Sequence, residues 1–175
     1  MPAIRPTLPI CAAVVAAALP VLADPAPPLA TPLVTIVEYG IYCRPDVEGT
    51  EAAPETSLGY INVFSGLPEF RFQQQQVPAR LGVSFGLVVE SSVDVAQVRM
   101  ETWKPGREVP EIWYSDLFAD VPSMRGYSFD FEAELIPGLW RMEAWDGETR
   151  LYSIDFEVVP PSALPGIGSD CNLLS

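Results

Sequence analysis

The chain contains no histidine, and its only lysine is Lys104. Without an imidazole, it lacks the usual base of serine hydrolases and a ligand that most zinc, copper and non-haem iron sites use. Metal binding would have to rely on carboxylates, which suit Ca²⁺. The sequence therefore predicts no catalytic residues, no metal site of the common kinds and no cofactor.

Basic residues are scarce throughout the chain. Ten Lys and Arg stand against 23 Asp and Glu, so the net charge is −13. Arg5 lies in a segment that we expect to be removed, which leaves 9 − 23 = −14 for the mature chain. So acidic a chain repels phosphate backbones and anionic lipid surfaces. We therefore predict no nucleic-acid partner and interpret the charge as a means of solubility.

Long apolar runs are also missing after residue 23. The one apolar run, Ile10–Leu22, follows a short leader that carries Arg5, and it ends at the compact residues Val21-Leu22-Ala23. This order is typical of a signal peptide, which we place at residues 1–23. No later segment approaches the roughly 20 apolar residues of a spanning helix. The sequence predicts a periplasmic or secreted protein with no membrane span.

Cysteine is rare, and one of the three falls in the predicted signal peptide. Cys11 does not fit a lipid anchor, because bulky Ile10 precedes it and the apolar run follows it. Cys43 and Cys171 remain, and in an oxidising compartment such a pair usually forms a disulfide. Closing a loop of more than a hundred residues contributes on the order of 5 kcal/mol in the chain-entropy model. We expect the bond to hold the C-terminal tail against the first strand.

Helical periodicity is absent, and alternation of apolar and polar residues with period two dominates instead. This pattern predicts half-buried strands, and prolines and glycines punctuate the gaps between them. The predicted strands cover residues 34–42, 58–64, 81–90, 96–103, 111–115, 127–132, 140–145 and 151–158. Clean alternation is typical of antiparallel sheets with one wet face. We predict an all-β, antiparallel immunoglobulin-like β-sandwich of seven or eight strands.

The composition also suggests the domain limits. A Pro-rich linker at 24–32 follows the signal peptide, the β-sandwich domain covers 33–159, and an irregular tail at 160–175 is tethered by the disulfide. Asp146-Gly147 indicates a hairpin turn. A two-residue loop would place Met142 opposite Leu151 and turn the apolar set of the second strand outward. We therefore predict a three-residue loop, Trp145-Asp146-Gly147, with Gly147 left-handed.

One catalytic motif occurs by its letters alone. Residues 82–86, Gly-Val-Ser-Phe-Gly, match the nucleophile elbow of serine hydrolases. That motif requires a strand-to-helix turn and a histidine, and here it lies within a predicted strand. Lys104, the only lysine that could act as a base, lies in a predicted turn. We interpret Ser84 as a residue on the polar side of its strand.

Acidic residues form two clusters that could hold Ca²⁺. Asp116 lies near Asp120, and Asp130, Glu132 and Glu134 alternate along a predicted strand. Neighbours at period two on a strand are roughly 7 Å apart, too far for tight chelation without another strand. A solvated acidic face is the simpler interpretation, and a calcium-stabilised structural module is one alternative. Paired carboxylates also carry out glycoside hydrolysis, so a carboxylate-based hydrolase or lyase acting on a glycan is a second alternative.

Two tryptophans fall on the polar register of their strands. Trp103 and Trp145 alternate with apolar residues, whereas Trp140 shares the apolar register. Exposed indoles stack on sugars or anchor partner proteins. Trp103 and Trp145 are thus a candidate binding surface for an unknown protein or glycan.

Three segments resemble a bacterial exported family known only as a domain of unknown function: Glu38–Cys43, Ser128–Phe131 and Leu135–Trp140, together with the final strand to Val159. The resemblance covers residues 34–159 and implies a small β domain, but it supplies no activity and no functional residues. We expect a non-catalytic exported domain that serves as a binding or accessory module of the cell envelope.

Overall fold

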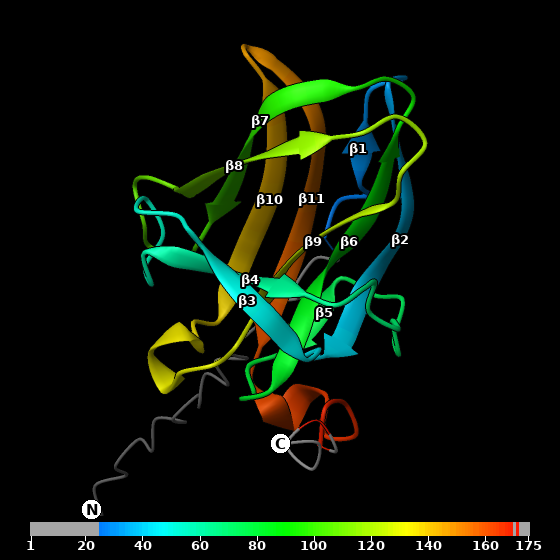
Figure 1. Ribbon diagram of the computed structural model, residues 1–175. Coiled ribbons are helices and arrows are strands. Elements are labelled where there is room, and N and C mark those ends of the chain that lie inside the picture. Colours follow the sequence, from blue (N-terminus) through cyan, green and yellow to red (C-terminus); the bar gives the residue numbers. More distant parts are fainter. Residues whose placement is uncertain (1–24, 170, 172–175) are drawn as a thin grey trace, which may run out of the picture.

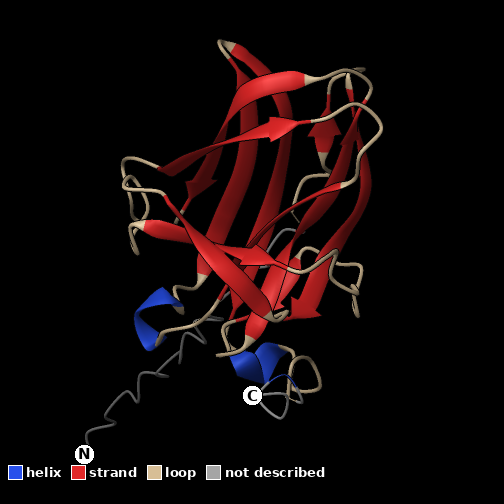
Figure 2. Ribbon diagram, viewed as in Figure 1, coloured by secondary structure: helices blue, strands red, loops and turns tan. Residues whose placement is uncertain are grey.

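The structure is a computed structural model that describes residues 25–169 and 171. The predicted signal peptide lies outside the described residues. Within them, the chain forms eleven strands and two single-turn 3₁₀ helices, with no α-helix (Figure 2). No helix in this part of the chain is long and apolar enough to cross a membrane.

Two sheets form the body of the molecule (Figure 1). The large sheet has the order β1 (Leu29–Ala30), β11 (Thr149–Val159), β10 (Gly138–Asp146), β7 (Val95–Trp103) and β8 (Glu111–Leu117), and β5 (Gln76–Pro78) runs parallel to β11. The small sheet consists of β2 (Val34–Cys43), β6 (Val83–Ser91) and β9 (Ser123–Ser128). A separate hairpin of β3 (Val47–Ala52) and β4 (Tyr60–Phe64) crosses below β8.

An aromatic core joins the two sheets. Phe85 of β6 packs against Trp140 of β10 and Phe156 of β11, with ring centroids 5.7 and 5.0 Å away. All three side chains are fully buried, and burial of each stabilises the fold by about 1.5–3 kcal/mol or more. The indole nitrogen of Trp140 donates a hydrogen bond to the Ile136 carbonyl. The predicted all-β immunoglobulin-like sandwich is confirmed, and three strands that were not expected, β1, β3 and β5, add to the seven or eight predicted.

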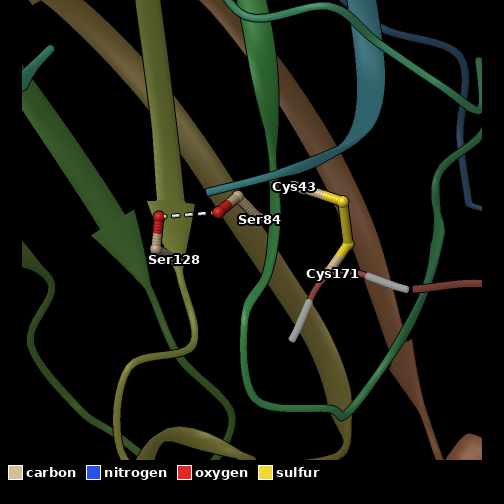
Figure 3. The surroundings of a disulfide bond; sticks show 4 residues. All are labelled: Cys43, Ser84, Ser128 and Cys171. Carbon is tan, nitrogen blue, oxygen red and sulfur yellow. Dashed lines mark hydrogen bonds between the residues drawn. A yellow bond between two sulfur atoms is a disulfide. The ribbon is translucent and has the colours of Figure 1, made fainter. Parts of the chain in front are cut away.

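The sequence predicts that each sheet has one solvent-exposed face, and the small sheet departs from this because its central strand β6 is buried on both sides. Tyr42, Phe70, Val88 and Met124 form a second apolar cluster on its outer face. Ser84, expected on the polar side of its strand, is fully buried on that face, where its hydroxyl lies 2.7 Å from the hydroxyl of Ser128 (Figure 3). Alternation within β6 could not reveal this cover, because Phe70 comes from a loop distant in sequence and Tyr42 and Met124 come from the neighbouring strands.

Strand β9 begins and ends earlier than predicted. It covers Ser123–Ser128, and the 3₁₀ helix η1 (Glu132–Glu134) occupies the end of the expected strand. The cause is Glu134, whose carboxylate accepts hydrogen bonds from the backbone N–H groups of Asp130 and Phe131. Asp130, Glu132 and Glu134 therefore do not share one strand face.

The β10–β11 hairpin keeps its apolar faces matched, although by another device than the predicted loop. Asp146 pairs with Thr149 around a two-residue turn, and a bulge between Ala144 and Trp145 shifts the register. Met142 consequently lies opposite Ile154, so the inward residues of both strands meet. Gly147 has a φ of +55°, as expected for the left-handed position.

Cys43 at the end of β2 and Cys171 in the tail form a disulfide (Figure 3). The two residues are 128 positions apart in sequence, and their Cα atoms lie 5.0 Å apart. The bond thereby holds the segment after β11, including the 3₁₀ helix η2 (Pro161–Ala163), beside the small sheet.

Candidate functional site

Trp103 and Trp145 both lie on the outer face of the large sheet, on neighbouring strands β7 and β10. Each indole is half-buried, and its N–H donates a hydrogen bond to a glutamate two residues earlier on the same strand. Trp103 donates to Glu101 at 3.0 Å, and Trp145 donates to Glu143 at 3.2 Å. Trp103 lies opposite Arg141, whereas Trp145 lies four residues further along this pair of strands, about 13 Å away. The backbone positions of the two tryptophans are therefore separated along the strands, with Glu101 and Glu143 between them.

Charged side chains occupy the space between these rings. Glu101 and Glu143 lie directly opposite each other, and Arg99 and Arg150 neutralise them at 2.8 and 3.1 Å. The same two guanidinium groups lie 5.6 and 5.8 Å from the ring centroid of Trp145. The indole rings and the two guanidinium groups together cover the nearly buried carboxylates of Glu101 and Glu143. The contacts of both tryptophans thus have a structural role.

The acidic clusters are engaged in internal contacts. Asp130 forms an ion pair with Arg44 at 2.8 Å, and Asp116 accepts a hydrogen bond from the backbone N–H of Gln97. Among residues 25–169 and 171, no group of three or more Asp, Glu, His or Cys side chains is arranged to hold a metal ion.

A cavity of 480 Å³ lies between hairpin β3–β4 and the β8 and β9 edges of the sandwich, and we call it the lateral cavity. Its walls combine apolar side chains such as Leu58, Phe64 and Trp113 with carboxylates and backbone. The lining residues are Glu51, Thr56–Leu58, Tyr60–Phe64, Gly66, Leu67, Thr102, Glu111, Trp113, Ser115, Pro122–Ser128, Asp130 and Glu134. Sequence reasoning did not single out a pocket here, because these segments meet only through tertiary contacts.

A buried polar network forms one end of the lateral cavity. The Lys104 ammonium donates to Glu111 at 2.5 Å and to the hydroxyl of Tyr127 at 2.8 Å, and it lies 3.3 Å from the hydroxyl of Ser57. Tyr127 donates in turn to Glu134 at 2.8 Å. Burial, and then the hydrogen bond to Glu134, raise the pKa of Tyr127 well above its ordinary value. The network connects hairpin β3–β4 to the sandwich, since Ser57 lies in the turn of that hairpin and also donates to Glu111.

Arg125 forms the other end. Its guanidinium donates to the carbonyl of Met124 at 2.7 Å and reaches the carbonyl of Asp116 on β8 at 3.4 Å, so it bridges the edges of β9 and β8. It also lies 5.2 Å from the ring centroid of Trp113. The side chain is 8% exposed, and its Nε has no hydrogen-bond partner in the described chain. Burial lowers the pKa of Arg125.

The outer face of the small sheet contributes a second unpartnered group beside the cavity. The hydroxyl of Tyr42 is fully buried without a hydrogen bond in the described part of the chain. It lies so close to Gly126 that a Cβ atom at position 126 would be 2.1 Å from it. Burial raises the pKa of Tyr42. Gly126 itself lines the lateral cavity.

The two-sheet core defines an immunoglobulin-like β-sandwich. The chain belongs to the family described as Domain of unknown function (DUF3859), whose model matches residues 30–158. Among solved structures, the chain is similar to an immunoglobulin-like protein from Pseudomonas aeruginosa, with 18% identity and a TM-score of 0.49 over 77% of this chain and 98% of that one. No curated protein matches the sequence.

Proposed function

We propose that this protein is a non-catalytic, exported binding module of the cell envelope that takes its ligand in the lateral cavity. The observation that carries the proposal is the cavity itself. Its volume of 480 Å³ falls within the roughly 300–1,000 Å³ of ligand sites. Its walls offer apolar side chains for contact and polar groups, such as Glu111, Glu134 and Arg125, that internal hydrogen bonds hold in place.

The state of the lining carboxylates supports binding rather than catalysis. Glu111 is held by Lys104, and Glu134 by Tyr127 and two backbone N–H groups. A general acid or base must reach the proton that it transfers, within hydrogen-bond distance of the substrate. These carboxylates are instead committed to the architecture of the cavity.

Export is supported by two features that are independent of the cavity. The first is the signal-peptide pattern of residues 1–23, and the second is the disulfide between Cys43 and Cys171. Disulfides persist in oxidising compartments such as the periplasm.

The test uses protein recovered from the periplasm and Nile red, an uncharged dye that fluoresces in apolar sites. We expect saturable binding of one dye per chain. Asn62→Trp, which adds an indole to the cavity wall, should abolish this binding. Val109→Trp is the matched control, because it adds the same side chain at a position that is 73% exposed and outside the cavity.

A third variant separates the cavity from the aromatic surface. The double substitution Trp103→Ala and Trp145→Ala should leave dye binding unchanged, since neither residue lines the cavity. Binding that survives Asn62→Trp but disappears in the double variant would contradict the proposal and move the ligand to the outer face of the large sheet.

A further inference from the structure

We propose that the ligand of the lateral cavity is an extended polypeptide segment that pairs with the free edge of β9. This inference rests on the proposed function and names the class of partner. It follows from the direction of the backbone hydrogen bonds in β9, from the treatment of the other sheet edges and from the charge of the cavity wall.

The hydrogen bonds of β9 show which of its groups are unpaired. The N–H of Phe129, just after the strand, donates to Val83, and the Phe129 carbonyl accepts from Gly82, so odd-numbered residues face β6. Met124, Gly126 and Ser128 therefore direct their N–H and C=O groups away from β6. The Met124 carbonyl accepts from Arg125, whereas the backbone groups of Gly126 and Ser128 have no partner in the described chain. Both residues line the cavity.

The other edges of the two main sheets are each covered in part. β11 is flanked by β1 and β5, and the outer edge of β2 bonds through Ile41 to Phe72. On β8, the N–H of Ile112 donates to Glu55 of the hairpin. Proteins commonly protect an open edge with Pro, Lys, a bulge or a cover, since an unpaired edge is a template for another strand. β9 contains neither Pro nor Lys, and its pairing with β6 has no bulge.

The edge of β9 is thus kept regular and unpaired inside a cavity. On the facing edge, β8 bonds at Ile112 and accepts from Arg125 at Asp116, which leaves Tyr114 between them with no backbone partner in the described part of the chain. A polypeptide satisfies such groups better than a small molecule, because its own N–H and C=O groups repeat at the spacing of the strand. Strand addition of this kind is an established mode of peptide recognition.

The charge of the cavity wall indicates the charge of the partner that it would bind. The cavity is lined by four carboxylates, from Glu51, Glu111, Asp130 and Glu134, and by one guanidinium, from Arg125. Lys104 and Arg44 neutralise two of these carboxylates, Glu111 and Asp130, so Glu51 and Glu134 remain against Arg125 and the wall keeps a small negative charge. The mature chain is expected to carry 9 − 23 = −14. Complementary charge favours encounter with partners of opposite sign. The segment that fits is therefore extended, apolar on alternate residues and net positive.

The experiment selects phage-displayed random decapeptides against the periplasmic protein and then studies the strongest binder as a synthetic peptide. We expect net-positive sequences that displace Nile red, and slowed hydrogen–deuterium exchange at the amides of Gly126 and Ser128 in the complex. Ser128→Pro removes the N–H that faces the cavity, and Pro is tolerated on edge strands. It should weaken the peptide about tenfold relative to Ser128→Ala, as expected for one lost hydrogen bond of about 1.4 kcal/mol.

Ser128→Ala is the matched control, because both variants lose the contact with Ser84 but only proline loses the amide. A peptide that displaces Nile red yet leaves both amides unprotected, and binds the two variants equally, overturns strand pairing while the proposed function stands. If none of the selected peptides displaces the dye, strand pairing in the cavity is overturned as well. If Nile red itself does not bind in the cavity, the proposed function fails first.

Discussion

Lys104 provides the sharpest test of how the lateral cavity is built. Its side chain is 6% exposed and pairs with Glu111, whose side chain is 16% exposed. Replacement by methionine keeps the length of the side chain and removes the charge. In the described chain, Ser57 is then the one residue that still donates hydrogen bonds to the Glu111 carboxylate, and Tyr127 loses its contact with the ammonium. Removing one partner of a buried ion pair costs about 3–5 kcal/mol, because the other charge stays buried without compensation.

We therefore expect Lys104→Met to lower the free energy of unfolding by about 3 kcal/mol or more, measured by urea denaturation followed by circular dichroism. At about 2–4 °C per kcal/mol for a domain of this size, the melting temperature should fall by about 10 °C. Exchange at the amides of the β3–β4 turn should rise as well, because Lys104 and Glu111 both contact Ser57 there.

Two controls separate the charge from the lost atoms. In Lys104→Met with Glu111→Leu, neither charge remains, and stability should return to within about 1 kcal/mol of the unmodified chain. Arg44→Met breaks an ion pair whose arginine is 47% exposed, and it should cost less than about 1 kcal/mol. A double variant as unstable as the single one, or a loss of under 1 kcal/mol in Lys104→Met, would refute the reasoning.

Three further predictions concern the frame of the sandwich. Replacing Cys43 and Cys171 by serine should lower stability by about 5 kcal/mol, because the bond closes a loop of 128 residues; urea denaturation measures the loss, and an unchanged midpoint would contradict it. Gly86→Ala should cost about 2 kcal/mol or more, since its Cβ would lie 2.1 Å from the Arg125 carbonyl, whereas Gly49→Ala meets nothing within 4 Å and should unfold at nearly the same denaturant concentration as the parent. Tyr42→Phe should be neutral or stabilising by about 1 kcal/mol at pH 7, because it removes a buried hydroxyl without a hydrogen bond in the described chain. Burial raises the pKa of Tyr42 in the folded state, so this ionisation leaves the stability of the fold unchanged below the ordinary pKa of 10 and lowers it above that pH, by up to about 1.4 kcal/mol per pH unit. Tyr42→Phe should remove this part of the fall in stability at alkaline pH, and identical pH profiles of the two proteins would contradict the prediction.

Much of the architecture was predictable from local pattern. The predicted strands overlap eight of the eleven observed ones and miss β1, β3 and β5. Period-two alternation finds a strand when its residues point alternately to the core and to solvent, because the pattern then lies within the segment itself. The apolar register of Trp140 placed it correctly in the core, and the positive φ of Gly147 followed from the need for a tight turn. Glycine supplies that conformation at little cost. These features depend on neighbours within a few residues.

The limits of that reasoning appear at Ser84 and Glu134. Ser84 reads as a surface residue in its strand, yet Tyr42 and Phe70 cover that face of the small sheet. Glu134 continues the period-two spacing of Asp130 and Glu132, yet its carboxylate accepts hydrogen bonds from two backbone N–H groups just after β9 and lies in a 3₁₀ helix. In both cases a partner outside the local pattern determines the outcome.

By itself, the sequence determined the all-β class, the cysteine pair available for a disulfide and the absence of histidine chemistry, because composition and alternation are properties of the chain alone. Only the tertiary structure decided that Lys104 joins Glu111, that Arg125 bridges β8 and β9, and that a cavity with an unpaired strand edge lies between them. The physical reason is that a cavity forms where segments far apart in sequence pack incompletely against one another, and the residues of any one segment do not indicate how the others will pack.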